Sequence, residues 1–219
     1  MDKLFGIGLT LFVWWLSIRI TRKYALPLAI LIICIILVIF KIDLNYYMHG
    51  GKVLKWFLMP AVIFLAVPLY RQTKLLKKNA VAIILSLTVG SLTAMFSVAI
   101  LSKILGIEKI IFLSLIPKSV TTAIGIEISK NIGGLQSITT VAIVSTGIFG
   151  NAIAPMIMNL FRIKNKVAQG IAIGAASHAG GTSRALEMGE TQGAFSGLAM
   201  GLSGIITVIL VPLVMKVLQ

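Results

Sequence analysis

The chain has 219 residues, of which 58% are apolar and 12% are charged, and its formal net charge is +14 at pH 7. The apolar residues lie in long runs, and roughly 18–20 such residues suffice to cross the hydrocarbon of a bilayer as a helix. This composition excludes a water-soluble globular domain and predicts an all-α, polytopic membrane protein with about seven or eight hydrophobic segments.

Two apolar segments are predicted near the N-terminus, at 4–18 and 26–40. The first has no small-residue cleavage site after its apolar run, so it is expected to be retained as a helix. Cys34 is expected to be buried in the second segment, and a single cysteine excludes a disulfide within the chain. A polar connection with a Gly-Gly turn is expected at 41–52.

Four further segments are predicted without a polar interruption, at 54–70, 80–102, 137–160 and 193–216. The first of them contains Pro60 and Pro68 and is expected to be kinked. The last is rich in glycines at four-residue spacing, which favours close helix packing. We expect one integral membrane domain over 1–219, with peripheral helices in 1–53 and a core in 54–217.

Two segments, 110–129 and 167–190, are long enough to span but carry polar residues in the middle. Pro117 interrupts the first, and the Gly180-Gly181 pair weakens the second. In hydrocarbon an unpaired backbone group costs several kcal/mol, so irregular backbone persists only inside protein or beside a water-filled cavity. The sequence therefore predicts two interrupted elements that line a sheltered polar pocket.

The basic residues suggest how these elements enter the membrane. They cluster in the connections 19–24, 71–78 and 162–166, beside apolar runs, which is the usual signal for cytoplasmic connections. Contact with anionic lipid is expected there, and a nucleic-acid partner is not. If 71–78 and 162–166 are both cytoplasmic, 110–129 is a re-entrant element from outside and 167–190 begins inside. Such a pair is typical of an inverted-repeat transporter core.

The residues after each interruption have the chemistry of an anion site. A new half-helix exposes free N–H groups and a partial positive charge, and two such ends facing each other bind anions. Lys118 and Arg184 would add full charges, and the fork of Arg suits a carboxylate. His178 would donate or carry a proton, and Glu187 would share in proton or charge coupling. The predicted substrate-binding residues are Lys118, Ser119, Thr121, Thr122, His178, Gly180, Gly181, Thr182 and Arg184.

Each charged residue also has a purely structural explanation. Lys118 can extend to the interface from a helix end, and His178 can be a hydrogen-bonded interior histidine. Arg184 and Glu187 are three residues apart and can neutralise each other on one helix. Glu127 and Glu190 are expected at solvated segment ends.

No catalytic constellation is present, so the chain is expected to be no enzyme, with no cofactor and no metal ion. Its two histidines and one cysteine lack metal-ligand spacing. Ser196 with His178 faintly resembles the pair of an intramembrane protease, but Ala194 stands where that motif has glycine.

Four stretches together resemble the bacterial LrgB/CidB membrane proteins, and the resemblance covers roughly 54–217. They are VPLYRQ, SLIPKSVTTAIGIEIS, TGIFGNAIAP and GIAIGAASHAGGTSRALEMGETQGAFSGLAMGLSGI. One departure is Ala123, where the family usually has proline.

The resemblance implies a multi-pass protein of the bacterial plasma membrane. Members look like holin-like or antiholin-like modulators of murein hydrolase activity and autolysis, and they act with a smaller LrgA/CidA-type membrane partner. Relatives fused to that partner in plastids resemble glycolate/glycerate translocators, and some bacterial pairs are similar to pyruvate carriers.

Two functions follow as hypotheses. The first is transport of a small monocarboxylate such as pyruvate, lactate or glycolate, with an LrgA/CidA-like partner and a link to autolysis. The alternative is an antiholin-like modulator of a holin-like pore that transports nothing itself. The chain is small for a carrier, so a homodimer or a hetero-complex is expected.

Overall fold

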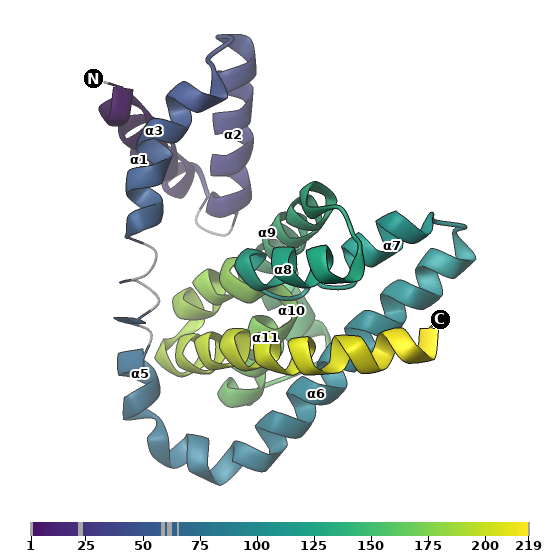
Figure 1. Cartoon of the computed structure of the whole chain (residues 1–219). Helices are drawn as coiled ribbons and strands as arrows, with labels where there is room; N and C mark the ends of the chain where they lie inside the picture. The colour runs from purple at the N-terminus through teal and green to yellow at the C-terminus, as the bar shows by residue number, and fades with distance from the viewer. Residues whose placement is uncertain (1, 22–23, 58–59, 61–62, 65, 219) are drawn as a thin grey trace. The chain divides into compact units, whose positions relative to one another are not determined.

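The computed structural model describes residues 2–21, 24–57, 60, 63–64 and 66–218. All regular structure among them is helical, as predicted, and it forms two compact units, Met1–Phe64 and Leu65–Gln219 (Figure 1). Within the described part of the chain, three helices are long and apolar enough to cross a membrane: Thr73–Ile104, Gln136–Leu160 and Glu190–Val217.

The first unit packs α1 (Asp2–Ile20) against α2 (Ala25–Ile39) and α3 (Leu44–Trp56). The backbones of α1 and α3 approach closely, because a Cβ added at Gly6 would lie only 3.0 Å from the Cα of Gly50. Beside this contact the hydroxyls of Thr10 and Tyr47 are 2.9 Å apart. Small residues thus bring the two helices together, as is common between membrane helices.

Helix α3 corrects the prediction of a polar connection at 41–52. Asp43 caps this helix by accepting a hydrogen bond from the N–H of Asn45 at 3.0 Å, which makes a helix start out of a polar stretch. The expected Gly-Gly turn is also wrong, since Gly50 serves the contact with α1.

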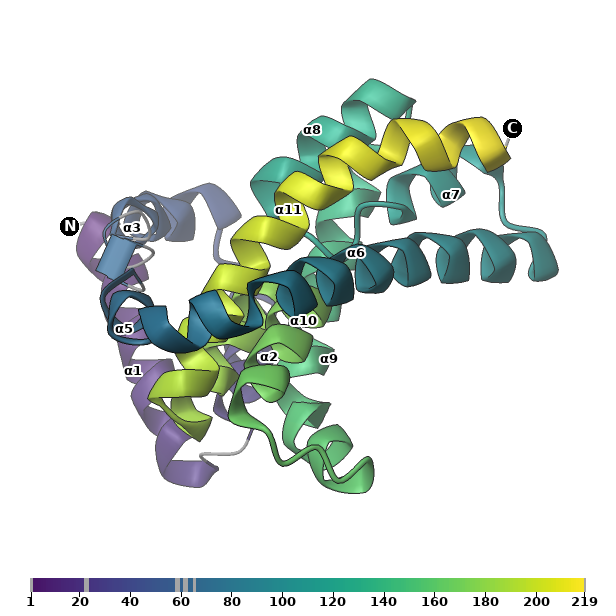
Figure 2. The same ribbon diagram turned by 90° about the horizontal axis from the view of Figure 1, so that it is seen from below.

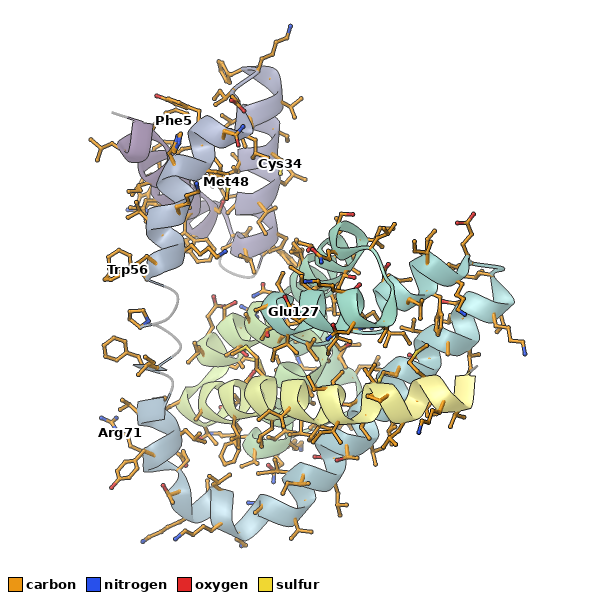
Figure 3. All side chains as sticks on the ribbon, viewed as in Figure 1. Phe5, Cys34, Met48, Trp56, Arg71 and Glu127 are labelled. Atoms are coloured by element: carbon orange, nitrogen blue, oxygen red, sulfur yellow. The ribbon has the colours of Figure 1, made fainter. Side chains whose placement is uncertain are left out.

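Two other predictions about this region have different outcomes. Cys34, expected to be buried, is exposed on α2 (Figure 3), as a lipid-facing side chain of an apolar helix would be. Parts of the predicted segment 54–70, at 58–59, 61–62 and 65, lie outside the described residues. Its ends belong to α3 and to α5 (Ala66–Arg71).

Two long helices of the second unit, α6 (Thr73–Ile104) and α11 (Glu190–Leu218), run in the same direction (Figures 1 and 2). Near their N-terminal ends Ile83 and Leu87 pack with Phe195, and near their C-terminal ends Met95 and Val98 pack with Val211. The third long helix is α9 (Gln136–Leu160). These three helices are the frame that holds the interrupted segments.

The first interrupted segment consists of α7 (Lys109–Leu115) and α8 (Thr122–Ile132), joined by the non-helical link 116–121. The chain doubles back here, because Ser114 near the end of α7 is bonded by Leu135, which follows α8. Gly133 has φ 86° and Gly134 packs on Ser114, so the glycines after α8 permit the return into α9.

The second interrupted segment is α10 (Lys166–Met188), which kinks at His178 with φ 39° and ψ −129°. The kink lies before the Gly180-Gly181 pair at which it was predicted. Ile173 and Ala185 share one apolar cluster, although roughly 18 Å would separate them in a straight helix. The second half of α10 therefore folds back along the first, and Gln192 at the start of α11 bonds Gln169 near the start of α10 at 3.1 Å.

Close approach of α9 and α10 at two glycines makes the first testable prediction. A Cβ added at Gly180 would lie 2.6 Å from the carbonyl oxygen of Gly147, which cannot rotate away. We expect Gly180→Ala to destabilise the protein by about 1–3 kcal/mol and to lower its melting temperature in detergent. Gly201→Ala is the matched control, because nothing lies within 4 Å of its added Cβ. Equal melting temperatures for the two variants would contradict the packing described.

Candidate functional site

A groove of about 690 Å³ lies between α6 and the first half of α10. Lys118 and Ser119 of the link 116–121 line one part of it. The other lining residues are Asn79, Ala82, Ile83, Ser86, Gly90, Thr93 and Ala94 of α6, with Asn165, Val167, Ala168, Ile171, Ala172, Ala175 and Ala176 of and just before α10. We call this hollow the Lys118 groove.

Lys118 is the cation of this groove and has no carboxylate partner among the described residues. The ion pairs found there join Arg71 to Glu190 and Arg184 to Glu187. The Nζ of Lys118 donates only a long hydrogen bond to the Oγ of its neighbour Ser119, at 3.4 Å. The side chain is half-buried, and the groove that it lines also borders Gly90 and Ala94 in the middle of α6. A charge inside the hydrocarbon of a membrane costs about 2.5 kcal/mol or more unless something compensates it.

One wall of the groove is a polar stripe on α6 that the sequence analysis missed. Asn79, Ser86 and Thr93 follow one another at spacings of seven, so they share a helix face. Each donates one proton to a carbonyl of its own helix, at 2.8, 3.0 and 2.8 Å, which leaves its oxygen lone pairs available. The seven-residue spacing was the available signal, but it was diluted within an apolar run.

The link that carries Lys118 is held by buried hydroxyls. The Oγ1 of Thr139 in α9 lies 2.9 Å from the carbonyl oxygen of Ser114 and 2.7 Å from the Oγ of Ser129. The N–H of Leu135 donates to the Oγ of Ser114 at 2.7 Å. These bonds tie α7, α8 and α9 together, so the position of Lys118 is fixed by both ends of its hairpin.

His178 is buried at the kink of α10, and its Nε2 lies 3.0 Å from the carbonyl oxygen of Ile143 in α9. A Cβ added at Gly125 of α8 would touch Ile143 and would lie 3.3 Å from the carbonyl oxygen of Pro117, so the partner of His178 packs near the first interruption. The hydrogen bond to Ile143 is the one expected of an interior histidine. It orients the ring and ties the kink of α10 to α9.

Backbone carbonyls at the kink find side-chain donors. Thr182 donates to the carbonyl of His178 at 2.8 Å, and its hydroxyl is also 2.9 Å from that of Ser196 in α11. Asn151 of α9 donates to the carbonyl of Gly180 and to the Oγ of Ser183, both at 3.0 Å. Asn151, which the sequence analysis did not select, thus ties the start of the second half of α10 to α9.

The predicted site residues divide into two groups. Lys118 and Ser119 line the groove, whereas His178 does not line it and is bonded to Ile143. Those that do not line it have structural contacts: Thr121 precedes α8 as its N-cap without a side-chain cap bond, Thr122 begins α8, Gly180 and Gly181 pack closely, Thr182 bonds Ser196, and Arg184 bonds Glu187. The Nε of Arg184 is buried and has no hydrogen-bond partner in the structure.

Among the described residues no group of three or more His, Cys, Asp or Glu side chains is arranged to hold a metal ion. Glu127 in α8 is exposed (Figure 3), and Glu190 at the start of α11 is exposed as well. The chemistry concentrated in the second unit is therefore one unpaired ammonium group in a largely apolar groove, with hydroxyls and one imidazole near it.

Comparison with known proteins gives one consistent family. A model of the LrgB-like family matches residues 10–217. The holin-like protein CidB of Staphylococcus aureus (strain Mu50) is 35% identical over 218 residues, which cover 97% of this chain and 95% of the relative. The antiholin-like protein LrgB of Bacillus cereus (strain B4264) is 37% identical over 169 residues, 77% of this chain and 74% of the relative. A Bacillus subtilis protein named YwbG is 36% identical over 90% of this chain and 89% of its own length. No solved structure matches.

The hydroxyl cluster that fixes the link makes the second testable prediction. Thr139→Val removes the bonds to Ser114 and Ser129 with little change of shape, and we expect a loss of about 1 kcal/mol in the free energy of unfolding. Unfolding in detergent measures this loss. Thr140→Val is the matched control, because the Oγ1 of Thr140 donates to Gln136 within its own helix. A loss in the control as large as in Thr139→Val would rule out a special role for the cluster.

Proposed function

The chain belongs to the LrgB-like family, whose members include multi-pass bacterial membrane proteins, and on that premise we propose that it carries small monocarboxylates across the plasma membrane. Pyruvate, lactate and glycolate are the candidate substrates. The carrier acts with an LrgA/CidA-like partner or as a homodimer, and the carboxylate flux influences murein hydrolase activity and autolysis.

The observation that carries this proposal is the unpaired Lys118 in the groove at the middle of α6. A carboxylate in the groove supplies the missing counter-charge, and the binding is strong because little water competes at that depth. The apolar wall of Ile83, Ile171 and several alanines suits the short hydrocarbon part of such a substrate. A single cation favours a monoanion over a dianion.

The start of α8 strengthens this anion site. The first N–H groups of a helix have no partner within it, and Thr121 supplies no side-chain cap. These donors do not line the groove, but they follow Lys118 by a few residues, so the partial positive charge of the helix end raises the positive potential around Lys118. Ser119 provides a hydroxyl at the same place.

Two re-entrant hairpins complete the proposed carrier. Helices α7 and α8 form a hairpin that enters and leaves at one side, which the bonds from Ser114 to Leu135 and Thr139 support. The two halves of α10 form the other, which the shared cluster of Ile173 and Ala185 supports. In this proposal α6, α9 and α11 each cross the membrane. The first hairpin follows α6 and the second follows α9, so the two hairpins enter from opposite sides, as in inverted-repeat carriers.

In this proposal His178 and Glu187 carry out the proton or charge coupling. His178 is held by the carbonyl of Ile143, which packs near the link that carries Lys118, so a change in the charge of His178 would act on the substrate site through this contact. Glu187 is paired with Arg184, and rearrangement of that pair during transport would expose one charge of each sign.

A second candidate function is favoured by the names of the relatives, which are holin-like and antiholin-like. In that case the chain assembles with a pore-forming partner and modulates it, and close-packed glycine faces matter more than Lys118. Saturable uptake distinguishes the two functions, since a modulator changes leakage without saturating.

Uptake of radiolabelled pyruvate into proteoliposomes, with and without the partner, tests the third prediction. We expect Lys118→Ala to abolish saturable uptake and Lys118→Arg to retain part of it, because the positive charge remains. Lys130→Ala is the matched control, since Lys130 is exposed and lines none of the hollows described. Full uptake by Lys118→Ala would remove Lys118 from the site. Dye leakage tuned by the partner, with no saturable uptake in the unmodified chain, would support the modulator instead.

A further inference from the structure

A second hollow, of about 850 Å³, lies at the other end of α6 from the basic connection 71–78. Lys103 and Lys109 line it, both exposed and neither paired with a described carboxylate. Its remaining lining residues are Ala99, Ser102, Ile107, Phe112, Met215 and Val217. Like the Lys118 groove, it combines amino groups with apolar walls, and we call it the outer hollow.

Helix α6 joins the two hollows. Its residues from Asn79 to Ala94 line the Lys118 groove, and those from Ala99 to Lys103 line the outer hollow. The helix has 32 residues and is therefore roughly 48 Å long, more than the hydrocarbon thickness of a bilayer. The two hollows therefore lie toward opposite ends of α6, and in a spanning helix these ends face opposite sides of the membrane.

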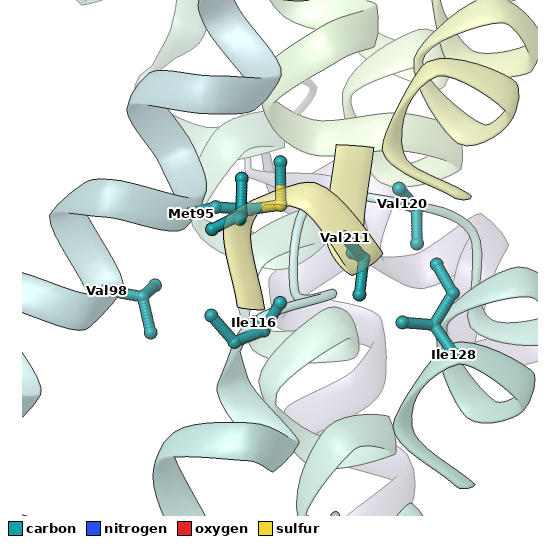
Figure 4. Packing of buried hydrophobic residues seen from close by; sticks show 7 residues of the cluster. Met95, Val98, Ile116, Val120, Ile128 and Val211 are labelled. Atoms are coloured by element: carbon teal, nitrogen blue, oxygen red, sulfur yellow. The ribbon is translucent and has the colours of Figure 1, made fainter. Parts of the chain in front are cut away.

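An apolar cluster separates the hollows along this helix (Figure 4). Its buried members are Met95, Val98, Ile116, Val120, Ile128, Val211 and Val214. Phe112 and Met215 lie both against this cluster and in the wall of the outer hollow. Toward the groove only a hollow of about 10 Å³ remains beside Pro117 and Ser119, room for about one water molecule. A dry constriction of this kind blocks an anion, which would lose its hydration there.

We propose that the outer hollow is a second anion site on the same transport path, which binds a small carboxylate through Lys103 and Lys109, and that the apolar cluster is the gate between it and Lys118. This inference rests on the proposed function. Ile116 and Val120 belong to the gate and bracket Lys118 on the link 116–121. Substrate that neutralises Lys118 and the movement that opens the gate thus both involve the link 116–121. This shared segment explains how substrate binding leads to passage through the gate.

Thiol labelling tests the sidedness of the two hollows. In a Cys34→Ser background, which removes the one native thiol, Ala99→Cys places a probe in the outer hollow and Ser86→Cys places one in the groove. We expect a membrane-impermeant maleimide to label Ala99→Cys only from outside the cell and Ser86→Cys only from the cytoplasmic side. Labelling of both positions from one side would overturn the proposed gate.

Protection of the cysteine from labelling tests which ligand occupies the outer hollow. We expect external pyruvate to slow labelling of Ala99→Cys several-fold, and Lys103→Ala with Lys109→Ala to abolish this protection. Phosphatidylglycerol that protects the position when pyruvate does not would identify a lipid site and overturn the proposal. If the unmodified chain shows saturable uptake but pyruvate gives no protection, the outer site fails while the proposed function stands. Absence of uptake is the separate result that refutes the proposed function.

Gate truncation supplies the fourth prediction. Met95→Ala opens a space in the gate, so we expect passive pyruvate efflux from loaded proteoliposomes to rise several-fold. Met158→Ala is the matched control, because Met158 is a comparably buried methionine in a different apolar cluster. Equal efflux from the two variants would overturn the assignment of the gate.

Discussion

The constraint on which the structure depends is that lipid offers no hydrogen bonds to an opened backbone. In both interrupted segments, side chains of α9 supply hydrogen bonds that lipid cannot offer. Thr139 accompanies Ser114 at the first interruption, and Asn151 bonds Gly180 at the second. Helix α9 is therefore more than a candidate span, because it supplies hydrogen-bond partners beside both interruptions.

Close packing and polar chemistry occur together in the second unit. Gly147 and Gly180 bring the backbones of α9 and α10 into contact, and this contact places His178 within reach of the carbonyl of Ile143. The unusual φ of His178 is a strained conformation for a residue with a Cβ, and it persists because neighbouring helices hold it from both sides. The kink is thus a product of tertiary contacts rather than of local preference.

The interruptions themselves could be predicted from the sequence, because Pro117 and Lys118 conflict with a helix in hydrocarbon. The location of the second break could not, since glycines only permit a kink and the contact with α9 selects His178. Arg184 and Glu187 are three residues apart, and that spacing alone does not decide between an ion pair and a ligand site. Helix α3 was missed because its polar composition resembles that of a connection. The stripe of Asn79, Ser86 and Thr93 was missed because isolated polar side chains are common in spanning helices.

The order in which α9 serves the two interruptions has a consequence for biosynthesis. The polar groups of Ser114 and Ser129 emerge from the ribosome before Thr139, so the first hairpin has no partners until the next helix has been made. The kink at His178 emerges when Ile143 and Asn151 are already in place. The first hairpin therefore gains these partners only when α9 has been made, whereas the second finds α9 already present and gains its remaining partners, Ser196 and Gln192, with α11.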